Sequence, residues 1–313
     1  MKYAFIVNPN SGHGKKARLF ISEIRELMKK NPDVSLHITR GMTDATIIAQ
    51  GLSDIASDTS TDTRIFACGG DGTINEVVNG IYGKTHVELG VIPIGSGNDF
   101  VRNFDSCNFL DINANLNGNT IPVDILRIEY EEDGKGKTRY CINGINIGFD
   151  GNTAILSNHL KKNKIFRGAL PYLTAIIMNV VEMRGQNLRI KDKDNIIHEG
   201  ELLLATFSNG RFCGGGIESC PNADVDDGLM EVLIVNKVSR RTFFRLMPAY
   251  IKGKLLEKET KEDIYKYIRS NRIAVEPLGG IMQFAVDGEE MKSGNAVIEI
   301  VKKGVKLVIP NSK

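Results

Sequence analysis

The sequence predicts an N-terminal α/β domain built on a parallel sheet, followed by a domain that is mainly a β-sandwich. In the N-terminal part, short apolar segments alternate with amphipathic segments of helical period. Further along the chain, many short strand-like segments are separated by glycine turns, which is typical of antiparallel sheets. A chain of 313 residues is also too long for one small core, so two domains are expected.

The helices of the first domain are predicted from apolar spacing and from capping residues. Lys15–Lys30 has the spacing of an amphipathic helix. Asp44–Ile55 is expected to form a second helix capped by Thr43. Thr73 is expected to cap a third helix, because Glu76 lies three residues further on, at the capping-box spacing. Strands that alternate with these helices in right-handed βαβ units are expected over Tyr3–Val7, Val34–Thr39, Arg64–Cys68 and Leu89–Pro93.

The character of the chain changes at Ile121–Ile128. This apolar run contains Asp124, whose carboxylate is costly to bury unless it is paired or bound to a donor. Glu131–Lys137 is polar and indicates an exposed hairpin tip, and two helical interruptions are expected at Asn152–Glu182 and Ser239–Leu256. The strands of the second domain are expected over Arg139–Ile147, Glu201–Asn209, Leu229–Asn236, Ile273–Glu276, Met282–Val286, Val297–Val301 and Lys306–Ile309.

Composition excludes several classes of protein. A net charge of +2 is too small for a general nucleic-acid-binding surface. The five cysteines are scattered and include no C-x-x-C pair, which indicates reduced packing residues and no zinc site. The chain opens without a signal-peptide pattern, and its longest apolar stretch, Ala169–Met183, is too short for a membrane span. We therefore expect a cytoplasmic protein that binds no nucleic acid.

Three polar or glycine-rich loops follow successive strands of the first domain: Asn8–Gly12, Gly69–Thr73 and Gly95–Asp99, the last of which opens another helix. The carboxyl ends of the strands in an open α/β sheet share one edge, where ligands bind. Glycines let an anion approach the backbone, and a helix N-terminus offers unpaired N–H groups and partial positive charge. Any one loop is equally typical of an ordinary tight turn, but three on one edge favour a nucleotide site. The pattern is neither a Walker loop nor the dinucleotide fingerprint.

Two acidic turns lie in the β-rich half. Asp224–Leu229 carries three carboxylates, and Asp287-Gly288-Glu289 follows an expected strand. Each turn alone is more typical of a hairpin than of a functional site. Beside a phosphate loop they acquire a function, because phosphoryl transfer requires Mg²⁺, which prefers oxygen ligands, and a carboxylate that accepts the proton of the attacking hydroxyl.

Taken together, these motifs resemble the diacylglycerol kinase catalytic family, and most closely its bacterial soluble lipid kinases. The resemblance rests on the three loops in this order and spacing, and it extends over essentially the whole chain. It implies the NAD kinase/diacylglycerol kinase-like fold, with an ATP-binding α/β domain at residues 1–126 and a lipid-substrate β-sandwich domain at 127–302. The C-terminal segment, about residues 303–313, often returns to the first domain in this family.

The resemblance also implies roles for individual residues. Asp287 and Glu289 match the acidic pair from which the general base is drawn. Asp71 and Asp124 match an acidic network that links the base region to the metal of the nucleotide. The implied nucleotide-contacting residues are Asn8, Pro9, Asn10, Ser11, Gly12, Thr39, Gly69, Gly70, Asp71, Gly72, Thr73, Asn75, Glu76, Ser96, Asn98 and Asp99.

The implied cofactors are ATP and Mg²⁺. Asp227 matches a structural Mg²⁺ ligand of the second domain, with the carbonyls of Asp224 and Leu229 completing the site. The expected activity is ATP-dependent phosphorylation of a lipid alcohol, with diacylglycerol converted to phosphatidic acid. One residue departs from the family pattern: Gly97 stands where related sequences often carry a larger or hydroxylated residue.

Contact with a membrane surface is expected to be transient, at the inner face of the membrane, and a homodimer is compatible with the sequence. Arg240–Arg245 and Lys161–Arg167 mix cations with aromatic residues. Such segments can dock on anionic headgroups, and they are equally typical of solvated helix faces with aromatic residues in the core.

Two other functions are compatible with parts of the pattern. A nicotinamide-nucleotide kinase shares a Gly-Gly-Asp-Gly-Thr loop and a β-rich second half, but the Asn8–Gly12 and Gly95–Asp99 loops favour the lipid kinase. A non-catalytic lipid-binding protein would have lost the acidic turn, whereas Asp287 and Glu289 are present. Phosphatidylglycerol, a sphingoid base or another lipid alcohol could use the same machinery as diacylglycerol.

Overall fold

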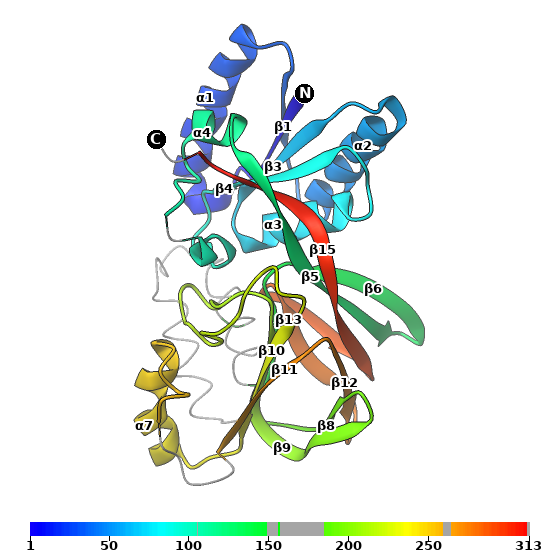
Figure 1. Cartoon of the computed structure of the whole chain (residues 1–313), viewed down its shortest axis with the longest axis vertical. Helices are drawn as coiled ribbons and strands as arrows, with labels where there is room; N and C mark the ends of the chain where they lie inside the picture. The colour runs from blue at the N-terminus through cyan, green and yellow to red at the C-terminus, as the bar shows by residue number, and fades with distance from the viewer. Residues whose placement is uncertain (105, 149–155, 157–184, 259–263, 312–313) are drawn as a thin grey trace. The chain divides into compact units, whose positions relative to one another are not determined.

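The computed structural model describes residues 1–104, 106–148, 156, 185–258 and 264–311 (Figure 1). The chain divides into two compact units. Unit 1 comprises Met1–Asp124 and Lys302–Lys313, and unit 2 comprises Ile125–Val301. The sequence placed the corresponding boundaries at residues 126 and 302.

Unit 1 is an α/β unit with the strand order β2-β1-β3-β4-β15. Its first four strands pair in parallel, and β15 joins β4 in parallel through Leu307 and Leu89. The strands are almost continuously buried toward their carboxyl ends, as expected for a sheet covered on both faces. Their bounds are Lys2–Val7 (β1), Val34–Ile38 (β2), Thr63–Gly69 (β3), Val87–Pro93 (β4) and Ala296–Ile309 (β15).

Helices cover both faces of this sheet. Alternate strand residues such as Phe5, Phe66 and Ile92 pack against α1, while Ile112 of α4 joins the same core. On the opposite face α2 and α3 pack against each other and against the strands. Figure 1 shows α1 and α4 on one side of β1 and β3 and α2 on the other. The helices run over Lys15–Lys30 (α1), Asp44–Thr59 (α2), Asp71–Ile81 (α3) and Ile112–Leu116 (α4).

Two predicted caps of unit 1 are wrong. Thr43 precedes α2 in a left-handed conformation and makes no side-chain capping hydrogen bond. The third helix begins two positions before Thr73, at Asp71, because Gly70 is extended and its carbonyl already accepts from the amides of Thr73 and Ile74. The segment after the third loop is also shorter than an α-helix, since η2 (Phe100–Asn103) is a single 3₁₀ turn.

Unit 2 is built from antiparallel strands in the order β14-β13-β7-β9-β8-β12-β15, with β10 bridging β9 and β11, and β5 bridging β15 and β6. Its core is a cluster of aliphatic and aromatic side chains drawn from these strands, including Phe207 and Phe284. The remaining bounds are Asn119–Glu132 (β5), Lys135–Cys141 (β6), Gly144–Gly148 (β7), Gln186–Asp192 (β8), Asn195–Ser208 (β9), Met230–Asn236 (β10), Tyr265–Ser270 (β11), Arg272–Pro277 (β12), Met282–Val286 (β13) and Glu289–Ser293 (β14).

The structure corrects several predicted strands of this unit. The segment predicted as one strand at Arg139–Ile147 is divided between β6 and β7, while the two segments predicted near the C-terminus are one strand, β15. Strands β8, β11 and β14 were not predicted. The predicted Ser239–Leu256 helix is α7, Arg240–Ile251, capped by Ser239. The predicted Asn152–Glu182 helix lies outside the described residues.

Candidate active site

The register of the parallel strands brings the three predicted loops to one edge of unit 1. Val7 pairs with Cys68, and Gly69 pairs with Pro93, so that β1, β3 and β4 end side by side. The Asn8 amide donates to the Cys68 carbonyl at 3.0 Å, and the Gly95 amide donates to the Gly69 carbonyl at 3.0 Å. The sheet edge that the sequence predicted as a ligand site is therefore assembled by backbone hydrogen bonds.

Glycines in these loops are required where backbones meet. A Cβ on Gly95 would lie 2.3 Å from the Cα of Gly70, and one on Gly69 would lie 2.2 Å from the Thr73 hydroxyl. Gly12 has a φ of +57°, and a Cβ there would lie 2.6 Å from the Ile94 carbonyl oxygen. Each of these positions brings one loop onto a neighbouring loop or helix, which gives the site a compact backbone floor.

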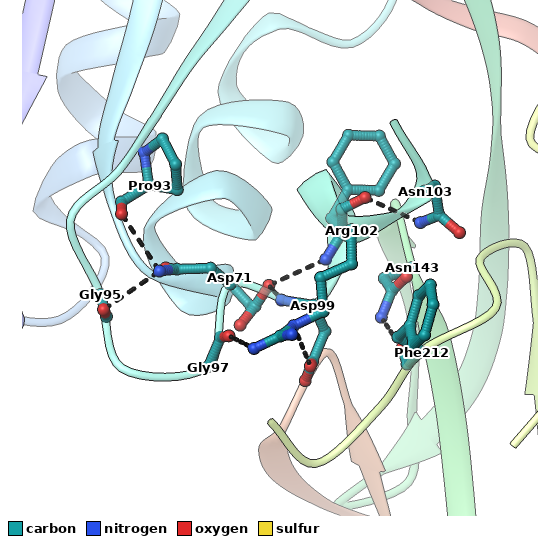
Figure 2. Close-up of polar contacts among 11 residues, drawn as sticks. Asp71, Pro93, Gly95, Gly97, Asp99, Arg102, Asn103, Asn143 and Phe212 are labelled. Carbon is teal, nitrogen blue, oxygen red and sulfur yellow. Dashed lines mark hydrogen bonds and ion pairs between the residues drawn. The ribbon is translucent and has the colours of Figure 1, made fainter. Parts of the chain in front are cut away.

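Asp71 ties the second loop to the third (Figure 2). It lies in the first turn of α3, and its Oδ1 accepts from the amides of Asp99 at 2.7 Å and Phe100 at 3.3 Å. A Cβ on Gly97 would lie only 2.8 Å from Asp71 Oδ2. This crowding gives a physical reason for glycine at the one position where the sequence departs from the family pattern.

The third loop is fixed by its own side chains. Asn98 has a φ of +57°, and its amide nitrogen donates to the carbonyls of Pro93 and Gly95, both at 3.1 Å. Arg102 Nη2 donates to the Gly97 carbonyl at 3.3 Å and its Nε lies 3.6 Å from Asp99 Oδ1. Ser96 is exposed between these anchors. Asn98 was predicted to contact the nucleotide, whereas here its amide group holds the turn.

The first loop is connected to α3 and to β2. Asn8 Nδ2 lies 3.5 Å from the Thr73 hydroxyl, and Asn8 Oδ1 accepts from the Asn10 amide at 3.0 Å. The Thr39 amide donates to the Val7 carbonyl at 3.0 Å, which places Thr39 beside this loop. Asn8 and Thr73 were both expected at one site, and the structure brings them together.

Two predicted site residues make contacts within the fold. Glu76 Oε2 accepts from the Ala45 amide at 3.0 Å, so its carboxylate satisfies an amide in the first turn of α2. Asp124 is fully buried, and its Oδ1 accepts from the Lys303 amide at 2.6 Å. That bond joins the end of the first segment of unit 1 to the returning strand β15, where Lys303 has a φ of +52°. A backbone amide thus supplies a donor to the buried Asp124 carboxylate.

In unit 2, the Asp287 carboxylate is surrounded by donors from the loop between β6 and β7. Oδ1 accepts from the amides of Asn143 at 3.1 Å and Gly144 at 3.0 Å and from the Cys141 thiol at 3.0 Å. Oδ2 accepts from the Ile142 amide at 3.0 Å. Asp287 itself has a φ of +46°, and its amide donates back to the Gly144 carbonyl at 3.0 Å. Hydrogen bonds in both directions therefore connect the Asp287 turn to the loop between β6 and β7.

Glu289 differs from Asp287 in the groups that bind its carboxylate. Glu289 forms an ion pair with Arg139 of β6, and both side chains are about three-quarters buried. Burial opposes the charge of Arg139, but Glu289 and Asp287 raise its pKa above the usual value. Burial, together with the Asp287 charge, raises the pKa of the Cys141 thiol well above its usual value, so the thiol remains a donor. Asp287 is thus held by backbone amides and Glu289 by a cation.

Asp227, the carboxylate of the implied structural metal site, is bonded to other groups of the fold. Asp227 Oδ1 accepts from the Leu229 amide at 2.9 Å, and Oδ2 forms an ion pair with Arg269. Arg269 Nε also lies 2.9 Å from a carboxylate oxygen of Glu231, which is buried. The Arg269 guanidinium therefore supplies positive charge to Oδ2 of Asp227, one of the oxygens that the resemblance assigns to the cation. Within the described ranges, no group of three or more His, Cys, Asp or Glu side chains is placed to hold a metal ion.

Sequence reasoning missed Arg139, Cys141 and Asn143, which surround the acidic turn. No motif marks them, because they are far from Asp287 and Glu289 in the sequence. The pairing of β13 with β7 brings the end of β6 and the loop after it to the acidic turn. Asn143 is 6% exposed and its Nδ2 donates to the Phe212 carbonyl at 2.8 Å (Figure 2). The signal that could have found this loop is the run Cys141-Ile142-Asn143-Gly144 between two strands.

Two family models match the chain. The model described as the diacylglycerol kinase catalytic domain matches residues 2–128, and the model described as the YegS C-terminal NAD kinase β-sandwich-like domain matches residues 144–309. A diacylglycerol kinase of Staphylococcus epidermidis is 31% identical over 288 residues, covering 91% of this chain and 84% of the relative. A diacylglycerol kinase of Mycobacterium tuberculosis is 29% identical, covering 82% and 80%. In the described part of the chain, helices fall short of the length and apolarity needed to span a membrane.

Solved structures share the fold. A diacylglycerol kinase from Bacillus anthracis superposes with a TM-score of 0.68 at 21% identity, covering 98% of this chain and 96% of that one. Yeast NADH kinase complexed with NADH superposes with a TM-score of 0.56 at 9% identity, covering 99% and 84%. The α/β unit followed by a β-sandwich unit, predicted from the sequence, is confirmed by these similarities.

Proposed function

This chain belongs to the diacylglycerol kinase family and is a lipid kinase, and we propose that it transfers the γ-phosphoryl group of ATP to the free hydroxyl of diacylglycerol. The products would be phosphatidic acid and ADP. The observation that carries this proposal is the register of β1, β3 and β4, which gathers Asn8–Gly12, Gly69–Thr73 and Gly95–Asp99 at one sheet edge of unit 1. Curated relatives of similar length bear the name diacylglycerol kinase, which favours this lipid as the acceptor.

ATP enters as its magnesium complex, as a substrate. Its triphosphate would lie over the backbone floor formed by Gly69, Gly70 and Gly95, at the N-terminus of α3. The positive end of a helix and its first-turn amides favour a phosphate there. Asn8, Thr39, Thr73 and Ser96 line the same edge and would contact the nucleotide.

The acidic residues would have two roles in the reaction, one as the base and one near the magnesium complex. A carboxylate of the Asp287–Glu289 turn takes the proton of the acceptor hydroxyl as its oxygen bonds to the γ-phosphorus, and the bond from that phosphorus to the oxygen of the ADP leaving group breaks. Asp71 and Asp124 lie in unit 1, where each accepts a hydrogen bond from a backbone amide. Asp71 orients the third loop through Asp99, and both carboxylates would contribute negative charge toward the magnesium complex.

A kinase assay with a panel of acceptors tests this proposal. Purified protein is given Mg·ATP labelled at the γ-phosphate, with diacylglycerol, phosphatidylglycerol, a sphingoid base or NAD as separate acceptors. We expect label in phosphatidic acid, with diacylglycerol as the preferred acceptor. Label transferred mainly to NAD, or to another lipid, would contradict the proposal.

A further inference from the structure

The helix α7 presents an apolar stripe to solvent on its outer face. Phe244 is 61% exposed and Ile251 is 37% exposed, and Pro248 between them is also exposed. These residues follow one another at i, i+4 and i+7, which is the spacing of one helix face. An exposed apolar stripe of this kind requires an explanation, because large apolar side chains are favoured in the core.

The opposite face of α7 accounts for the stability of the helix. Phe243 and Tyr250 are buried and pack on Leu203, Leu204, Leu233 and Val235 of β9 and β10. The two neighbouring aromatic residues therefore separate, because Phe243 enters the core while Phe244 remains outside, with their rings nearly perpendicular and their centroids 5.7 Å apart. Phe244 is not needed to anchor the helix, which leaves it available for a partner.

The outer face is also strongly basic. Arg240, Arg241, Arg245, Lys252 and Lys254 lie within or just after α7, and no Asp or Glu occurs between Ser239 and Leu256. Within the described residues, Arg241, Arg245, Lys252 and Lys254 form no ion pair. Glu218 approaches Gly253, just after α7, and its carboxylate lies 3.9 Å from Arg211. Since the whole chain carries a net charge of only +2, this concentration of cations is local.

We propose that the outer face of α7, with Arg241, Phe244, Arg245, Pro248 and Ile251 at its centre, docks on the surface of a bilayer that contains anionic lipid. The cations match the negative charge of the headgroups, and the stripe of Phe244 and Ile251 enters the boundary between headgroups and acyl chains. The inference rests on the proposed function, since a lipid acceptor resides in a membrane, but the docking is a binding property that does not require catalysis.

Vesicle sedimentation without ATP tests the docking directly. Wild-type protein is mixed with phosphatidylcholine vesicles, with or without phosphatidylglycerol, at low and high salt. We expect binding that needs phosphatidylglycerol and weakens as salt rises. Arg241→Glu/Arg245→Glu should weaken binding by at least tenfold, since each cation near such a surface is worth about fivefold. Phe244→Ala should weaken it as well, with less dependence on salt.

Two controls distinguish an effect of the α7 surface from an effect of net charge and from an effect on phosphoryl transfer. Arg25→Glu/Lys30→Glu makes the same charge change on exposed positions of α1, and should bind vesicles like wild type. Both double variants should phosphorylate a short-chain diacylglycerol that is dissolved as monomers at the wild-type rate. If the kinase assay fails while the vesicle results hold, the proposed function is wrong and the docking surface remains.

Three outcomes would overturn the inference. Vesicle binding that does not depend on phosphatidylglycerol would show that the cations of α7 do not bind anionic headgroups. Equal loss of vesicle binding in the α7 and α1 variants would show that the outer face of α7 is not the docking surface. A wild-type dimer that the α7 variants convert to a monomer, as measured by light scattering, would assign the face to a second copy of the chain.

Discussion

Several carboxylates of this molecule hold backbone amides. Asp287 accepts from the amides of the loop between β6 and β7, and Asp71 from amides of the third loop. Asp124 accepts from the Lys303 amide, and Glu76 from the Ala45 amide. A carboxylate held in this way is fixed in position, and removing it leaves amides without their acceptor. A substitution at such a residue therefore changes local structure as well as charge, so activity and stability have to be measured together.

The two acids of the turn are expected to respond differently to neutral substitutions. Asp287→Asn replaces one acceptor oxygen by an NH₂ group that faces amide donors, so we expect both reduced turnover and a lower Tm. Glu289→Gln keeps an acceptor for Arg139 and should leave the Tm nearly unchanged. If Glu289 is the base, turnover of this variant should fall by about 10²–10⁴-fold.

Steady-state turnover and thermal unfolding of both variants check this. Loss of turnover in Asp287→Asn alone, with the Tm of the wild type retained, would assign the base to Asp287. Wild-type turnover in both variants would contradict the proposed role of the turn.

At the scale of elements, α2 and α3 pack closely because one of them has a glycine at the contact. A Cβ on Gly80 of α3 would lie 2.6 Å from the Thr46 carbonyl oxygen and 2.7 Å from the Ala49 Cβ. The Thr46 hydroxyl donates to the Glu76 carbonyl at 2.9 Å, and the Ser53 hydroxyl lies 3.2 Å from the Gly80 carbonyl oxygen. This contact sets the position of α3, whose N-terminus forms part of the candidate site.

Two glycine-to-alanine substitutions in these helices should have opposite effects. Gly80→Ala places a methyl group against the backbone of α2, and we expect it to lower the free energy of unfolding by about 1–3 kcal/mol. Gly51→Ala in α2 meets no atom within 4 Å and should raise it by about 0.5–1 kcal/mol, because alanine loses less chain entropy. Urea unfolding compares the two, and equal effects would contradict the close α2–α3 contact.

Periodicity predicted α1 with its bounds and the parallel sheet of unit 1, because the apolar pattern there is set by burial on known faces. The starts of helices were less predictable. The Gly70 carbonyl accepts the first hydrogen bonds of α3, so the helix begins before Thr73, and the Glu76 carboxylate accepts from an amide of α2 instead of completing a capping box in α3. The contacts of the acidic turn with Arg139 and Cys141 depend on long-range strand pairing, which no local pattern encodes. The three loops were predictable as a group because the ends of parallel strands share an edge.

At the scale of the whole molecule, unit 1 is completed by residues from the far end of the chain. Leu307 and Val308 of β15 are fully buried, and Leu307 pairs with Leu89 of β4. Lys303 donates its amide to Asp124, and Asn311 donates to the carbonyls of Ala114 and Asn117. The stability of unit 1 is therefore expected to depend on the part of β15 from Lys302 onward, which follows the whole of unit 2 in the sequence.

Substitutions at adjacent positions of β15 test this dependence. Leu307→Ala leaves a cavity in the core of unit 1 and should cost about 2–5 kcal/mol of unfolding free energy. Lys306→Ala changes an exposed residue beside it and should cost less than about 0.5 kcal/mol. Urea unfolding measures both, and similar costs would show that β15 does not support the core of unit 1.

The most direct test of the account is a crystal structure of the protein with Mg·ADP. We predict that the diphosphate lies within hydrogen-bonding distance of backbone amides in Gly69–Thr73, at the N-terminus of α3, with Asn8 and Ser96 beside it. A nucleotide bound away from this edge of the unit 1 sheet would contradict the account.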